Sequence, residues 1–193
     1  MNSTRASLLA RVRDFADGAA WQEFYDRYAP VLYGYARSCG LGHADAEEVR
    51  DRCLDRLLRD LPGFVYDRSR GRFKSWLSAV ARTKVADVLR LRRDRRNLDT
   101  AELLAIPDGG PSPAEAWAEQ WRLQGLRVEL QRARQRVSTQ FWSAFELLLE
   151  GELSPGEIAG KLRMSRGQVY KAKWQVLREV RAAMARQRTE DPA

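Results

Sequence analysis

Residues 154–181, SPGEIAGKLRMSRGQVYKAKWQVLREVR, contain two helix starts that lie eleven positions apart. From Ser154 onward, a serine cap, a proline at the first helical position and a glutamate at the third form a capping box. Ser165 begins the same pattern again, with a glutamine in place of the glutamate. The spacing leaves room for a first helix of about two turns over residues 155–162. The stretch therefore predicts two helices joined by a tight turn.

The apolar residues of this stretch are spaced to close a small core between the two helices. Ile158, Ala159 and Leu162 share one face of the first helix. We expect that face to be covered by residues of the turn and the second helix, namely Met164, Val169, Val176 and Val180.

A helix-turn-helix of this kind reads DNA, because the first turn of its second helix can enter a major groove. The second helix is strongly basic, with eight Lys and Arg against one acid over residues 163–188. Side chains at its start can meet phosphates and base edges in the groove. The alternative interpretation is a surface hairpin of helices with a solvated charged face. The candidates for duplex DNA binding are Ser165, Arg166, Gln168, Lys171 and Lys173.

Composition points to a polyanionic partner. The chain has 193 residues and a formal net charge of +8, with an isoelectric point of about 9.9. Its positive excess lies in two blocks: residues 66–96 carry eleven Lys and Arg against three acids, and residues 163–188 form the other. This pattern predicts two contact surfaces for nucleic acid. Two solvated charged faces are the alternative.

Several classes of protein are excluded by what the chain contains. Its two cysteines and one histidine do not give a metal-ligand spacing, so we expect neither a metal nor a cofactor. We expect Cys39 and Cys53 to be core or boundary residues. No apolar run has the length of a signal peptide or membrane span, which predicts a cytoplasmic protein without a membrane partner. The adjacent acids Asp45, Glu47 and Glu48 are explained by their place at a helix start, where the helix dipole favours negative charge. We therefore expect no enzymatic activity.

The rest of the chain predicts an all-α fold of two helical domains. Helical spacing favours helices at residues 4–14, 19–38, 43–60, 72–96, 113–137 and 139–149. Residues 97–112, rich in Pro and Gly, predict a flexible linker between an N-terminal domain, 1–96, and a C-terminal domain, 113–188. The helix predicted at residues 19–38 carries an aromatic stripe that we expect to be core: Trp21, Phe24, Tyr25, Tyr28, Leu32 and Tyr35.

Aromatic and basic residues alternate at the start of the first positive block. Such interleaving suits unpaired nucleic acid, because every base offers a face for stacking and every nucleotide a charge. Core packing is the alternative interpretation for Phe73 and Trp76. We expect the inner face of this helix to hold Phe73, Trp76, Leu77, Val80, Lys84, Val88 and Leu91.

In order and spacing, these features resemble the extracytoplasmic-function (ECF) sigma factors, small promoter-recognition subunits of bacterial RNA polymerase. The resemblance spans about residues 4–184 and is carried by ADAEEV at 44–49, RGRFKSWL at 70–77 and the segment 153–169. The chain departs from the family at 50–52, where Arg-Asp-Arg replaces an apolar residue followed by Gln-Glu. Arg163 also replaces the usual turn glycine, which predicts a turn built differently.

The resemblance implies a sigma factor that binds RNA polymerase core and directs promoter recognition and transcription initiation. RNA polymerase core and promoter DNA would be its partners, and the resemblance leaves an anti-sigma factor open as a third partner. Core polymerase binding would fall to Asp45, Glu47, Glu48, Asp51 and Arg52. Unpaired bases of the minus-ten element would meet Phe64, Tyr66, Arg70, Arg72, Lys74 and Arg82. The helix-turn-helix, with the five candidates above, would read the minus-thirty-five element. The alternative is a helix-turn-helix regulator that acts without polymerase core, which leaves the first basic block without a task.

Overall fold

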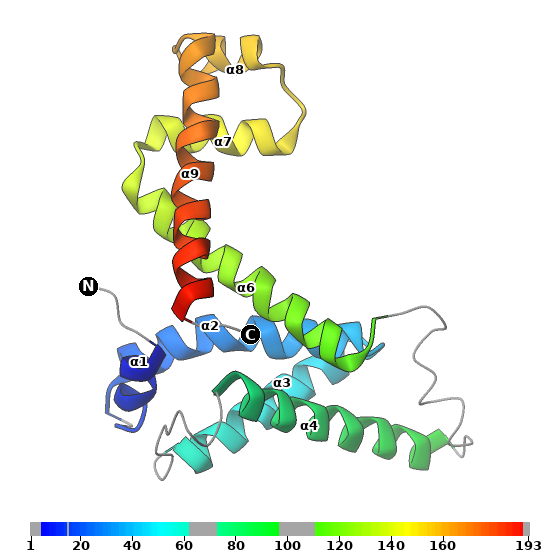
Figure 1. The fold of residues 1–193 in the computed structure, drawn as a ribbon. Coiled ribbons are helices and arrows are strands. Elements are labelled where there is room, and N and C mark those ends of the chain that lie inside the picture. The colour runs from blue at the N-terminus through cyan, green and yellow to red at the C-terminus, as the bar shows by residue number, and fades with distance from the viewer. Residues whose placement is uncertain (1–4, 15, 62–72, 97–110, 191–193) are drawn as a thin grey trace. The chain divides into compact units, whose positions relative to one another are not determined.

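The computed structural model describes residues 5–14, 16–61, 73–96 and 111–190, and within these ranges its regular elements are helices without any strand (Figure 1). This confirms the predicted all-α fold. The chain divides into two compact units, Met1–Arg122 and Leu123–Ala193, and the boundary falls inside helix α6, Pro113–Arg136. Most of the predicted linker, residues 97–110, lies outside the described residues. The domain limits 1–96 and 113–188 therefore stay a prediction.

The first unit contains α1 (Arg5–Arg11), α2 (Gly18–Ser38), α3 (His43–Asp60), α4 (Phe73–Arg96) and the first part of α6. The prediction of a helix reaching residue 14 is wrong, because α1 ends at Arg11. Asp14 instead accepts a hydrogen bond from the backbone N–H of Ala16 at 2.9 Å, which turns the chain toward the start of α2.

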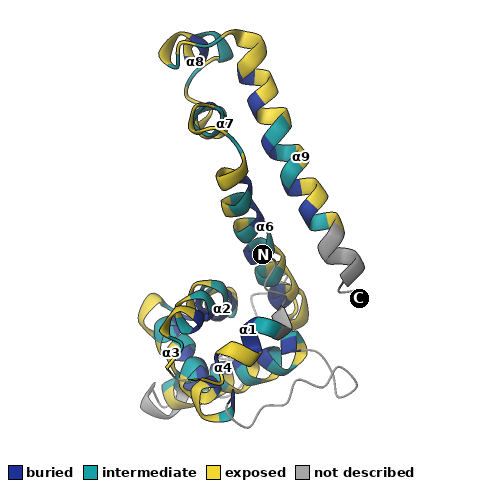
Figure 2. Cartoon of the chain, turned by 90° about the vertical axis from the view of Figure 1, so that its left-hand side faces the viewer, coloured by how far each residue is buried: buried dark blue, intermediate teal, exposed yellow. Residues whose placement is uncertain are grey.

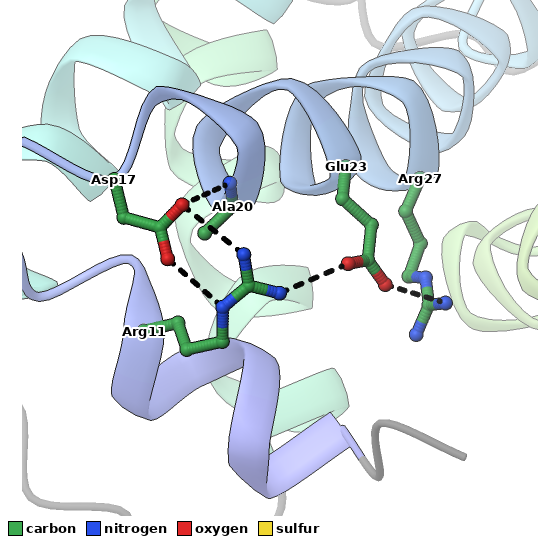
Figure 3. A network of polar contacts seen from close by, with 5 residues as sticks. All are labelled: Arg11, Asp17, Ala20, Glu23 and Arg27. Atoms are coloured by element: carbon green, nitrogen blue, oxygen red, sulfur yellow. Dashed lines mark hydrogen bonds and ion pairs between the residues drawn. The ribbon is translucent and has the colours of Figure 1, made fainter. Parts of the chain in front are cut away.

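Ion pairs join α1 to the first turns of α2 (Figure 3). Asp17 caps α2 by accepting from the backbone N–H of Ala20 at 2.9 Å. Its two carboxylate oxygens also accept from the guanidinium of Arg11, at 2.9 and 3.1 Å. The hydrogen bond from Arg11 and the one from Ala20 lower the pKa of Asp17 below its ordinary value. Glu23 extends the network, 3.5 Å from Arg11 and 3.4 Å from Arg27.

The core of the first unit is built on the aromatic stripe of α2. Phe24 and Tyr28 are buried, and the ring of Phe73 from α4 packs edge-on against both, with centroids 6.1 and 5.1 Å apart. Tyr25 is the exception to the prediction, since it lies one residue further around the helix and is 44% exposed. Cys53 is fully buried, and burial raises the pKa of its thiol to about 12. Cys39 is half-buried, so both cysteines are core or boundary residues as predicted.

Residues 113–122 of α6 complete this core. Trp117 is buried, with its ring edge-on to that of Tyr35 at 5.3 Å. The side chain of Gln120 on α6 occupies the space next to Gly34 of α2, where a Cβ would meet its amide group. The start of α6 is therefore an integral part of the first unit.

The second unit contains the remainder of α6, α7 (Thr139–Glu150), α8 (Pro155–Lys161) and α9 (Arg166–Glu190). Ile158, Ala159 and Val169 share one apolar cluster, with Met164 packed against it, as predicted. Val176 and Val180 were expected there too, but they pack with Ala133 and Phe145 in a separate cluster. The seven residues from Val169 to Val176 rise about 10 Å, which carries the later valines past the short α8. Figure 2 shows buried residues recurring along α9.

The two capping boxes predicted at Ser154 and Ser165 are present and reciprocal, and a third begins α6. Ser112 pairs with Glu115, Ser154 with Glu157 and Ser165 with Gln168, in each case through both side chains. Each box satisfies backbone N–H groups that have no partner inside the helix. The caps fix the starts of α6, α8 and α9 where the sequence predicted them.

The turn between α8 and α9 keeps a left-handed residue although no glycine is present. Arg163 has a φ of 52°, so the expectation of a turn built differently is wrong. Two hydrogen bonds hold the turn: Met164 N–H donates to the carbonyl of Ala159 at 2.9 Å, and Gln140 Nε2 of α7 donates to the carbonyl of Leu162 at 2.8 Å. These contacts stabilise a backbone conformation that arginine adopts at some cost.

Candidate nucleic-acid and polymerase interfaces

The first turn of α9 combines a cap with two of the predicted DNA-binding residues. The Ser165 hydroxyl accepts from the backbone N–H of Gln168 at 3.1 Å, and Gln168 Oε1 accepts from the backbone N–H of Ser165 at 2.7 Å. The amide oxygen of Gln168 is thus engaged in the cap. Its amide nitrogen is the group left to reach a base edge.

Arg166 extends from the start of α9 across the first turn of α8. A Cβ built on Gly156 would lie 2.9 Å from Nη2 of Arg166 and 3.1 Å from its Nε. The guanidinium can occupy this position because residue 156 has no side chain. Arg166 remains exposed, so its charge is available to a phosphate or a guanine edge.

The outer face of α9 is basic and also aromatic. Lys171 and Lys173 are exposed, as the sequence predicted. Tyr170 and Trp174 are exposed too, at 58% and 59%, and sequence reasoning did not single them out. Their signal was present, since they lie one helical turn apart and out of phase with the buried side of the helix. That buried side consists of Val169, Ala172, Val176 and Val180.

The predicted polymerase-binding residues of α3 separate into two groups. The carboxylate of Asp45 pairs with the guanidinium of Arg92 on α4 and is only 21% exposed. Asp45 therefore joins two helices of the first unit. The other four predicted residues follow along α3, with Glu48 and Arg52 one and two turns on from Asp45 on the same side of the helix.

Those four residues form short-range ion pairs on an accessible helix surface. Glu48 pairs with Arg52 at 2.6 Å, and Asp51 pairs with Arg50 at 2.7 Å. Glu47 lies 3.3 Å from Arg50. Exposed pairs of this spacing each contribute only a few tenths of a kcal/mol to a helix. Rearranging them to meet a protein partner would therefore cost little.

The nucleic-acid candidates of the first unit are only partly described. Phe64, Tyr66, Arg70 and Arg72 lie outside the described residues. On α4, Arg82 is exposed, and the Lys74 ammonium lies 5.7 Å from the ring centroid of Trp121.

The aromatic residues of α4 belong to its inner side. Phe73 is 4% exposed and Trp76 packs partly buried against the core, which confirms the core interpretation for both. Lys84 is half-buried and lies 3.4 Å from Asp87. The prediction of Leu91 as an inner residue is wrong, because it is 43% exposed beyond the end of the core.

The described residues also bear on two other classes of site. No helix there is long and apolar enough to cross a membrane. Likewise, the described His, Cys, Asp and Glu residues include no group of three that could hold a metal ion.

Comparison with known proteins gives matches to both a domain family and a curated relative. Residues 24–97 match the sigma-70 region 2 family, a range that covers most of α2, all of α3 and all of α4. The ECF RNA polymerase sigma factor RpoE of Cereibacter sphaeroides is 25% identical over 163 residues, which cover 84% of this chain and 85% of the relative. No solved structure matches significantly.

Proposed function

We propose that the chain is a divergent ECF sigma factor and that separate surfaces of it carry out the tasks of that family. Its function is to bind bacterial RNA polymerase and direct transcription initiation. The family regulates transcription, and we assign the chain no catalytic step of its own. Polymerase core and promoter DNA are its partners, and we infer a cytoplasmic location because both are found there.

The observation that carries the proposal for duplex DNA is the exposed basic side of α9 in a capped helix-turn-helix. Arg166, Lys171 and Lys173 are exposed on this helix and close to its start. A helix with cations at its N-terminal turns fits a major groove, where they neutralise phosphates and reach base edges. We assign this surface to the minus-thirty-five element.

The outer side of α3 is our proposed surface for the polymerase core. Glu48 and Arg52 pair with each other there, and Glu47 and Asp51 both pair with Arg50. We leave Asp45 out of this contact, since its carboxylate already pairs with Arg92. Charge complementarity on such a face would favour specificity and rapid association.

Lys74 and Arg82 of α4 are our candidates for contact with the unpaired minus-ten strand. Arg82 is exposed, and Lys74 lies at the edge of the aromatic cluster formed with Trp121. A cation next to an aromatic ring is the combination that single-stranded nucleic acid binds. Phe64, Tyr66, Arg70 and Arg72 stay predictions from the sequence, and an anti-sigma partner stays a proposal.

A pull-down with purified bacterial RNA polymerase core, followed by transcription from a pool of genomic fragments, tests the function. We expect the full chain to bind core and to produce discrete new start sites with a shared upstream motif. The outcome against the proposal is tight duplex binding without any binding to core. That result would favour the regulator that acts without polymerase and would implicate the Arg-Asp-Arg departure at residues 50–52.

A further inference from the structure

Two large aromatic side chains on α9 remain outside any core. Tyr170 and Trp174 are each more than half exposed, although every other tryptophan of the described residues is buried or half-buried. The two are four positions apart and thus lie one above the other on the helix surface. They are on the side of α9 away from its buried residues, which Figure 2 shows in dark blue. An exposed aromatic pair at this position indicates a contact surface.

The surroundings of this pair are cationic. The guanidinium carbon of Arg178 lies 4.7 Å from the ring centroid of Trp174, and Lys171 and Arg181 are exposed on the same side of the helix. Glu179 is the one acid between residues 163 and 188. It is half-buried, 3.5 Å from Arg136. An aromatic surface framed by cations fits a polyanion, so we take duplex DNA as its occupant.

A recognition helix that lies along the major groove brings residues beyond its first turn to the DNA. Trp174 lies eight positions after Arg166, a rise of about 12 Å, which equals the length of about three to four base pairs. Within the major groove, the C5 methyl of thymine is the apolar group that a base pair presents. A large apolar side chain that faces a base edge there would discriminate thymine from the other bases.

We propose, building on the function proposed above, that Trp174 packs against a thymine methyl group in the major groove. Tyr170 borders this contact, and Arg178 holds the indole ring by stacking on it. The chain then reads a thymine about three to four base pairs from the position that Arg166 meets. This preference adds to whatever the polar residues of the first turn of α9 select.

The test compares thymine with uracil, which differ by the methyl group alone. A randomised duplex pool is selected for binding to the full chain and, in parallel, to the Trp174→Ala variant. The best duplex is then remade with each thymine replaced in turn by deoxyuridine. Affinities are measured with the chain alone and again with the chain bound to polymerase core.

We expect one thymine whose replacement weakens wild-type binding about fourfold, the loss that one buried methyl group predicts. Trp174→Ala should show no loss at that position and should not select thymine there. An equal loss in wild type and variant, or no methyl-dependent loss in either form of the assay, overturns the inference. An unchanged affinity of the variant for DNA would instead assign this face to another acidic macromolecule.

Two further variants separate this contact from general effects. Leu149→Ala removes an apolar side chain that is 67% exposed on α7 and should keep the thymine preference. Lys171→Ala should reduce the salt dependence of binding by about one charge while keeping the methyl effect. Loss of core binding in the pull-down would count against the sigma-factor function but not against this contact, because the duplex assay also runs without polymerase.

Discussion

The guanidinium of Arg166 rests on the backbone at Gly156, where an added Cβ would lie 2.9 Å from Nη2. The contact joins the first turn of α8 to the first turn of α9, the two capped starts of the helix-turn-helix. Gly160, on the same short helix, has nothing within 4 Å of an added Cβ. The two glycines therefore form a matched pair for testing what the position of Arg166 contributes.

Gly156→Ala should weaken duplex binding by displacing the Arg166 side chain. The loss should be part of that caused by Arg166→Ala, which is about 1–3 kcal/mol for a guanidinium that meets a base edge. Gly160→Ala should leave binding unchanged and raise stability by up to about 1 kcal/mol, because alanine favours the helix. Fluorescence anisotropy with promoter duplex measures both effects. If Gly156→Ala still weakens binding in an Arg166→Ala background, the coupling between the two residues is disproved.

Asp45 and Arg92 should act on stability, whereas the outer residues of α3 should act on polymerase binding. Asp45→Asn and Arg92→Gln each break the pair between α3 and α4 and should lower the melting temperature. The expected cost is about 1 kcal/mol, since the pair is only partly buried. Glu48→Lys should weaken core binding in a pull-down while changing the melting temperature little. A strong loss of core binding with Asp45→Asn but not with Arg92→Gln would contradict this prediction and show that Asp45 contacts the polymerase.

Lys74→Ala should reduce binding to DNA that contains an unpaired bubble more than binding to fully paired DNA. Its ammonium lies 5.7 Å from the ring centroid of Trp121, so a single strand that stacks on this ring would also meet the charge. Lys84→Ala is the control on the same helix, because Lys84 already pairs with Asp87 at 3.4 Å. Parallel titrations with bubble and duplex probes give the ratio of affinities. An equal loss on both probes would contradict a role for Lys74 in strand capture.

Trp117→Ala should destabilise the first unit by about 3–5 kcal/mol, the usual cost of truncating a buried aromatic side chain. Trp117 is 4% exposed and packs against Tyr35 of α2. Hydrogen exchange in full-length protein should therefore accelerate in peptides from α2. The exposed Trp174 supplies the control, since Trp174→Ala should change stability by no more than about 0.5 kcal/mol. Unchanged protection of α2 in Trp117→Ala would show that residues 113–122 do not support this core.

The Asp17 carboxylate should make the attachment of α1 sensitive to acid. Its hydrogen bond from Arg11 lowers the pKa of Asp17 in the folded state. The carboxylate therefore stabilises the fold above its ordinary pKa, and this stabilisation is lost as the pH falls through the lowered value. Asp17→Asn keeps a capping side chain but removes the charge. The melting temperatures of wild type and variant should differ at pH 7, and the difference should shrink as the pH falls from about 4 through the lowered pKa. A constant difference across this range would contradict the role of the charge.

Local chemistry made much of this architecture predictable. A capping box joins residues three apart, so Ser112, Ser154 and Ser165 set the starts of their helices without help from the rest of the chain. Apolar spacing likewise predicted α2, α3 and α7 to within one residue at each end. The basic character of α9 and the aromatic stripe of α2 were predictable for the same reason, since period and charge are properties of neighbouring residues.

Contacts between distant residues were decided only by tertiary packing. Nothing in the sequence predicts the contact of Asp45 with Arg92 or that of Arg166 with Gly156. The sequence also does not distinguish the exposed Tyr170 and Trp174 from the aromatic residues that are buried. The start of α6 illustrates the same limit: its cap is local, but the burial of Trp117 depends on packing against Tyr35 of α2. Helix starts follow from hydrogen bonds within one turn. Which side of a helix is buried, and which charges are left for a partner, follows from how the helices pack.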